Sequence, residues 1–144
     1  LEARGKMLVG SCLAGISFLK GLGFVHAISH MVGAEFDTQH GLTNAIVLPS
    51  VLKYNQHVMD KKIPIMSEAM GLQKNDFDNF YQSICDLLDQ LDIPKNLSEI
   101  VFEASSVERL AEKALKDSAF ATNPRTASLE QMVDLINISM NKGR

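Results

Sequence analysis

Aromatic side chains and clusters of basic residues are scarce in this sequence of 144 residues. Tryptophan is absent, only two tyrosines are present, and aromatic residues make up 6% of the chain. The 14 basic residues are outnumbered by 17 acidic ones, which gives a net charge near −3. Nucleic-acid binding normally needs a basic patch, or aromatic side chains on which bases can stack. No nucleic-acid partner is therefore expected.

The sequence contains only two cysteines, Cys12 and Cys85. They lie far apart, and neither belongs to a CxxC motif. This usage is typical of reduced thiols in a cytosolic protein rather than of a disulfide framework, although two cysteines can still pair. We therefore expect a cytoplasmic protein.

A long uninterrupted apolar run is also missing. The stretch from Met7 to Ile28 comes nearest to one, but Lys20, His26 and four glycines interrupt it. A membrane-spanning helix needs about 20 apolar residues in succession. Because its apolar residues surround the helix almost completely, we interpret the first segment as a buried helix at the centre of a bundle, with no membrane partner.

The alternating pattern of strands is absent, and apolar residues recur at helical spacing instead. With 46% hydrophobic residues and this length, one compact domain is expected. The fold class predicted is all-α, a bundle of about seven helices. The helical segments cover residues 8–19, 26–32, 41–54, 58–70, 76–91 and 107–119 and a last stretch that begins after Ser128.

Several residues mark where these helices begin, bend or end. Asp76, Ser106 and Ser128 are the expected N-terminal caps, because their side-chain oxygens can accept from free backbone amides. Gly33 is expected to end the second helix. Pro49 is expected to bend the third, because proline removes one backbone hydrogen bond.

Three of the four histidines fall within one short run, GLGFVHAISHMVGAEFDTQHG. His26 and His30 are four residues apart, so on a helix they share a face and can reach one metal ion. His40 follows a turn and can meet them. Each of the three can also be a structural residue whose ring only bonds to the backbone, and spacing alone leaves this open. His57, in a polar stretch, is interpreted as a surface residue.

The chain opens on Leu1-Glu2-Ala3-Arg4, without an initiator methionine and with the composition of a helix interior. It is therefore interpreted as a fragment of a longer protein.

The segment AGISFLKGLGFVHAISHMVGAEFDTQHGLTNAIVLP carries a family likeness. It resembles the C-terminal helical domain of the iron-containing (group III) alcohol dehydrogenases, with the dehydroquinate synthase-like fold. The signature of that family is GLG-x-x-H-A-x-x-H-x-x-G followed by HG-x-x-N-A-x-x-LP. The segment Asn123-Pro124-Arg125 resembles the NPR loop before the last helix of the family.

The resemblance implies a role for each clustered histidine. His26 and His40 would bind a catalytic divalent metal, Fe²⁺ or in some relatives Zn²⁺. His30 would face the nicotinamide of NAD or NADP and the substrate, and would relay a proton. This differs from the pairing of His26 with His30 that spacing favours. Phe18 is interpreted as a core residue, with a place in the substrate pocket as the alternative.

The implied parent protein is an NAD(P)-dependent enzyme that interconverts an alcohol and an aldehyde or ketone. Residues 1–144 would be its C-terminal metal-binding domain, and the N-terminal nucleotide-binding domain, absent from this chain, would be its main partner. A homodimer is a further possible assembly. The alternative function is a non-catalytic helical module without activity of its own.

Overall fold

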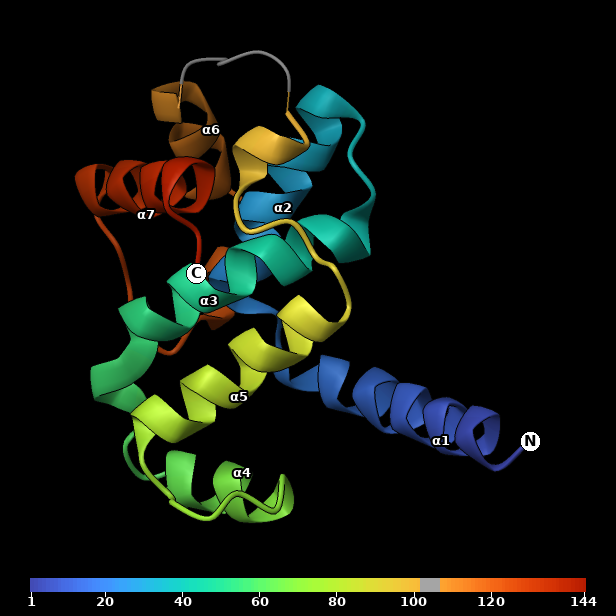
Figure 1. Ribbon diagram of the computed structural model, residues 1–144. Helices are drawn as coiled ribbons and strands as arrows, with labels where there is room; N and C mark the ends of the chain where they lie inside the picture. Colours follow the sequence, from blue (N-terminus) through green and yellow to red (C-terminus); the bar gives the residue numbers. More distant parts are fainter. Residues whose placement is uncertain (102–106) are drawn as a thin grey trace.

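The computed structural model describes residues 1–101 and 107–144, which form seven α-helices, three short 3-10 helices and no strand (Figure 1). The predicted all-α fold is thus confirmed. The α-helices are α1 (Glu2–Ser17), α2 (Gly23–Phe36), α3 (His40–Met59), α4 (Ile63–Ala69), α5 (Phe77–Gln90), α6 (Val107–Ala114) and α7 (Leu129–Asn141). The 3-10 helices are η1 (Phe18–Lys20), η2 (Leu97–Glu99) and η3 (Phe120–Thr122).

The main core lies where α2 packs against α3 and α6, while α7 covers α6 and α3 (Figure 1). Apolar side chains that share one face of each helix meet there and lose their contact with water. A smaller cluster joins α3 to α4 and α5 through Leu52, Ile63 and Phe80. The main core includes Phe24, Ala27, Ile28, Val32, Ile46, Val47, Val51, Leu110, Ala111, Ala114, Met132, Leu135 and Ile136.

Side chains from a distant part of the chain cap the start of α2, which has no capping side chain of its own. The hydroxyl of Thr122 accepts from the backbone amides of Leu22 and Gly23, at 3.0 and 3.2 Å. The side-chain oxygen of Asn123 accepts from the amide of Phe24 at 3.2 Å. These bonds satisfy donors that every helix start leaves free. They also fix where α2 begins.

Asn123 is itself held by a reciprocal amide pair with Asn55 of α3, which is buried. The two side chains exchange hydrogen bonds of 3.0 and 2.9 Å, and Asn123 also donates to the carbonyl of Arg125 at 2.7 Å. The segment that resembles the NPR loop therefore joins α2 to α3.

The turn between α2 and α3 lies later than the sequence predicted. Gly33 is inside α2, and the helix ends at Phe36; the next residue, Asp37, caps it in the left-handed backbone conformation with φ 53°. Aspartate tolerates this conformation better than most residues. Thr38 and Thr43 join their hydroxyls across the turn at 2.8 Å, and α3 then begins at His40.

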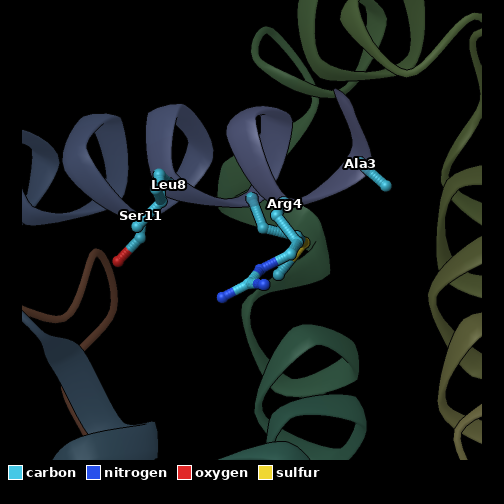
Figure 2. A pocket seen from close by; sticks show the side chains of 5 residues that line it. Ala3, Arg4, Leu8 and Ser11 are labelled. Atoms are coloured by element: carbon cyan, nitrogen blue, oxygen red, sulfur yellow. The ribbon is translucent and has the colours of Figure 1, made fainter. Parts of the chain in front are cut away.

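The first helix is formed as predicted, but its predicted burial is wrong. None of its residues is buried, Leu8 and Ile16 are 73% and 62% exposed, and the helix projects away from the others (Figure 1). The apolar residues do form a helix, but no other part of the described chain packs along it. A groove of about 500 Å³ beside Ala3, Arg4 and Ser11 is lined by α1 alone (Figure 2).

Two of the later helices begin at the predicted caps. Asp76 accepts from the amide of Asn79 at 2.8 Å, and Ser128 forms a capping box with Gln131. Helix α4 is shorter than predicted, because Pro64 lies in its first turn. Helix α6 is also shorter than predicted and ends at Ala114. The predicted cap Ser106 lies outside the described residues. The helical spacing of apolar residues in the segment 76–91 also predicts burial of Leu87 and Leu91, and this prediction is wrong because both are exposed.

Among the described residues, no single helix is long and apolar enough to cross a membrane. One pair, residues 2–20 with 23–36, meets the requirement only jointly and is bent by 99°.

Replacing Asn123 by alanine is expected to destabilise the fold by about 2–3 kcal/mol, because it leaves the amide of Phe24 and the buried side chain of Asn55 without partners. Urea denaturation of Asn123→Ala measures the change. Asn137→Ala, at an exposed position of α7, is the control and should change stability by less than about 0.5 kcal/mol. Equal stability of the two variants would contradict this role for Asn123.

Candidate metal centre

The fold brings the three clustered histidines together at the junction of α2 and α3. The ring centroids of His26 and His40 are 5.2 Å apart, those of His30 and His40 5.4 Å, and those of His26 and His30 5.7 Å. His26 and His30 lie one turn apart on α2, and His40 is the first residue of α3. His26 and His30 are half-buried and His40 is exposed. His57, as predicted, is exposed, in the last turn of α3.

The amide of Asn44 links His26 to His40. Its Nδ2 lies 3.3 Å from Nε2 of His26 and 3.0 Å from Nε2 of His40. An amide N–H donates, so in this arrangement Nε2 of each ring is placed as the acceptor. Ser29, which is fully buried on α2, bonds through its hydroxyl to Oδ1 of Asn44. The two predicted ligands thus direct the same ring atom toward one point.

His30 has a different partner. Its Nδ1 lies 3.1 Å from Oδ2 of Asp117, a residue that follows α6. Oδ1 of Asp117 accepts from the amide of Ala119 at 2.8 Å, which holds the carboxylate in place. A carboxylate only accepts, so Nδ1 of His30 donates and its Nε2 is left as the basic ring atom.

Burial lowers the pKa of His26 below its ordinary value of 6.5, and the nearby His40 and His30 lower it further. Burial disfavours the charged imidazolium, and like charges repel. The carbonyl of Leu22 and the charge of Asp117 oppose this shift of the pKa. Nδ1 of His26 is buried, and no atom of the described residues meets hydrogen-bond geometry with it.

A cleft of about 410 Å³ opens beside His26 and Asn44, with walls formed by Leu22, Val25, Ala45 and Leu48. Phe18 stands edge-on to His26, with ring centroids 6.3 Å apart. Phe18 is 57% exposed, so its assignment to the core is wrong.

The donor set fits a divalent metal only in part. Two imidazole nitrogens without protons are suitable ligands for iron or zinc. A catalytic centre normally has at least three protein ligands, however, and no group of three His, Cys, Asp or Glu side chains in residues 1–101 and 107–144 is placed to hold one ion. Two imidazole nitrogens thus meet at the junction of α2 and α3, without a third ligand beside them in the described residues.

Sequence reasoning missed Asn44, Ser29 and Asp117. Asn44 lies four residues after His40, so helical spacing alone places the two on one face. The contact of Asn44 with His26 and that of Asp117 with His30 depend on how the helices pack, and no local signal reveals them.

Comparison with known proteins bears on this arrangement. The family model for the Fe-containing alcohol dehydrogenase family, C-terminal, matches residues 1–140. The chain belongs to this family. The probable alcohol dehydrogenase EutG of Escherichia coli is 37% identical over 136 residues, which cover 94% of this chain and 34% of that protein. The lactaldehyde reductase of Escherichia coli is 32% identical, over 93% of this chain and 37% of that protein.

Solved structures of this family share the fold. An alcohol dehydrogenase from Oenococcus oeni superposes with a TM-score of 0.86 at 29% identity, over 96% of this chain and 38% of that one. An iron-containing alcohol dehydrogenase from Thermococcus thioreducens gives 0.84 at 31% identity, over 98% and 38%. This chain of the iron-containing alcohol dehydrogenase family thus spans slightly more than a third of the length of these relatives.

The lowered pKa of His26 predicts how stability changes with pH in the metal-free chain. Below the unfolded pKa of about 6.5, the unfolded chain binds a proton at His26 that the folded chain resists, so acid favours unfolding. The stability of the folded chain is therefore undiminished by His26 at neutral pH and decreases as the pH falls below about 6.5. Urea denaturation at neutral pH and at about pH 5.5 should show a smaller loss of stability for His26→Gln than for the wild type. An equal loss would contradict the shift.

Proposed function

We propose that residues 1–144 are the C-terminal helical, metal-binding part of an NAD(P)-dependent alcohol dehydrogenase that interconverts an alcohol and an aldehyde or ketone. The observation that carries this proposal is the convergence of His26 Nε2 and His40 Nε2 on one amide nitrogen. Family membership supports the type of reaction, because relatives named as alcohol dehydrogenases and as a lactaldehyde reductase match nearly all of this chain.

His26 and His40 would hold Fe²⁺, or Zn²⁺ in its place, through their Nε2 atoms. Such a metal would supply Lewis acidity to the substrate oxygen, favouring the alkoxide of an alcohol and polarising a carbonyl in the reverse direction. The two imidazoles contribute neutral ligands whose positions are set by separate helices. The remaining ligands would come from polypeptide outside the 144 residues.

His30 would exchange the proton of the reaction at its Nε2 and contact the nicotinamide. Asp117 accepts from Nδ1 of His30, which leaves the lone pair of Nε2 to take a proton from the alcohol. The same carboxylate stabilises the imidazolium that results. In the reverse direction Nε2 would return the proton to the carbonyl oxygen. Asp117 therefore acts through His30, as a positioning residue.

The cleft beside His26 would admit a small alcohol or aldehyde. Its walls include the apolar side chains of Leu22, Val25, Ala45 and Leu48. The exposed apolar surface of α1 would pack against polypeptide outside the 144 residues, such as the nucleotide-binding domain that the family resemblance implies. We place the protein in the cytoplasm, as its unpaired Cys12 and Cys85 favour, and a homodimer is compatible with this function.

Substitution in an enzyme that carries the complete polypeptide separates the roles of the three histidines. His26→Ala or His40→Ala should release the metal and abolish turnover, since each removes one ligand. His30→Ala should keep one metal per subunit and lower turnover by roughly 10²–10⁴-fold, as loss of a general base does. Metal analysis together with steady-state kinetics measures both effects, and His57→Ala is the matched control on the exposed end of α3. Loss of metal in His30→Ala would show that the assignment is wrong.

The 144-residue chain alone is expected to fold, because the core between α2, α3, α6 and α7 closes without further polypeptide. It should bind metal only weakly and oxidise no alcohol, because two ligands and no nucleotide-binding domain are present. Calorimetry with Zn²⁺ and with NAD tests this expectation. Submicromolar binding of both would mean that a complete site exists here, and a complete polypeptide without activity would favour the non-catalytic module.

A further inference from the structure

The cleft beside His26 adjoins a second cavity of about 270 Å³. Leu22, Val25 and Leu48 line both the cleft and the second cavity, and all three side chains are half-buried. Leu22 and Val25 pack against the main core, whereas Leu48 packs against the smaller cluster that joins α3 to α4 and α5. The second cavity therefore lies where the two hydrophobic clusters meet.

The second cavity follows one face of α3 away from His26. Ala45 and Leu48 line the cleft, and Asn55 and Met59 line the second cavity together with Leu48. Multiples of three and four residues separate these positions, so they share one side of the helix. From Ala45 to Met59 a helix rises by about 21 Å. The cleft and the second cavity thus form one groove, which we call the α3 groove, and it leads from His26 toward α4.

The far part of the α3 groove offers mainly apolar surface. The apolar side chains that line it include Val51, Leu52, Val58, Met59 and Met66. Asn55 and Asn123 also line it, but they bond to each other at 3.0 and 2.9 Å. Lys62 lines it too and is exposed, so its ammonium group can stay in water. Burial of methylene groups is the favourable interaction that such walls provide.

We propose that the substrates are primary alcohols and aldehydes with a straight aliphatic chain, which extends from the cleft over Leu48 into the second cavity. This inference rests on the proposed function, in which the reacting oxygen lies beside His26 and His40. A short alcohol such as ethanol occupies the cleft alone. The chain of octanol also reaches the walls at Val58 and Met59, and the transfer of its methylenes from water favours the longer substrate.

A series of primary alcohols from ethanol to octanol tests the proposal in an enzyme that carries the complete polypeptide. The value of kcat/KM should rise with chain length, by roughly fourfold for each methylene that enters the second cavity. An increase that stops at propanol would overturn the proposal, because the second cavity would then be filled by other polypeptide. An enzyme without activity on any alcohol would contradict the proposed function instead.

Two substitutions narrow the α3 groove at different distances from His26. Leu48→Phe adds bulk where the cleft and the second cavity adjoin, and Val58→Phe adds bulk to the second cavity alone, at an exposed position. In each variant the ratio of kcat/KM for octanol to that for ethanol should fall by about tenfold, because two or three methylenes lose their place in the groove. An unaltered ratio in both folded variants would overturn the proposal.

Leu87→Phe is the matched control for Leu48→Phe. It makes the same exchange at an exposed position of α5 that lines neither the cleft nor the second cavity. The ratio of kcat/KM for octanol to that for ethanol should therefore stay as in the wild type.

Binding of octanol to the metal-free 144-residue chain tests the α3 groove without turnover. Isotope-labelled methionine methyl groups report on it, because Met59 and Met66 line the second cavity, while Met7 and Met70 are exposed outside it. The NMR signals of Met59 and Met66 should shift when octanol is added, and those of Met7 and Met70 should not. Ethanol at the same concentration is the control and should shift none of the four.

Equal shifts of all four methyl groups would mean adventitious apolar binding and would overturn the proposal, as would unshifted signals of Met59 and Met66. The methyl signals depend on neither metal nor turnover. Shifts confined to Met59 and Met66 in a protein that oxidises no alcohol would therefore refute the proposed reaction and leave the α3 groove as a site for aliphatic chains.

Discussion

The first backbone amides of α2 have no acceptor within their own helix and need acceptors from another part of the chain. The position of the candidate site depends on which residues supply those acceptors. Thr122 and Asn123 supply the acceptors, about a hundred residues later in the chain. The approach is close: a Cβ added at Gly21 would lie 2.4 Å from Cβ of Thr122, and Gly21 has a φ of 104°. Only glycine combines that backbone conformation with that lack of bulk.

Once the start of α2 is fixed, the positions of the chemical groups along it follow from helix geometry. His26 lies in the first turn after the capped amides, His30 one turn later, and Ser29 faces the partner helix between them. The Asn55–Asn123 pair ties the same loop to α3, whose first turns carry His40 and Asn44. One polar loop thus sets the relative position of the two helices that carry the predicted ligands. Because the ligands come from separate helices, a small shift of this loop would separate them.

The sequence predicted well what depends on neighbouring residues and poorly what depends on packing. The caps at Asp76 and Ser128 and the all-helical fold are local properties, and the structure confirms them. The spacing of His26 and His30 also predicted their proximity. The nearest pair of rings is His26 with His40, however, and their approach depends on how α2 packs against α3. Only the family resemblance pointed to that pair, and it is the pair that Asn44 bridges.

Helix α1 also shows the difference between what the local sequence predicts and what packing decides. Its apolar residues lie on nearly every face of the helix, and from this pattern we expected the helix to be buried at the centre of the bundle. Burial depends on neighbours, and the described residues of this chain provide none along α1. Even so, the superposition on the Thermococcus thioreducens structure covers 98% of the chain. The part left uncovered is shorter than α1, which has 16 residues, so part of α1 must be included in the match. A chain more than twice as long therefore contains a segment that matches most of α1, within the same superposition as the core. The projecting position of α1 is thus compatible with a longer polypeptide, in which its apolar faces would have neighbours that this chain does not itself supply.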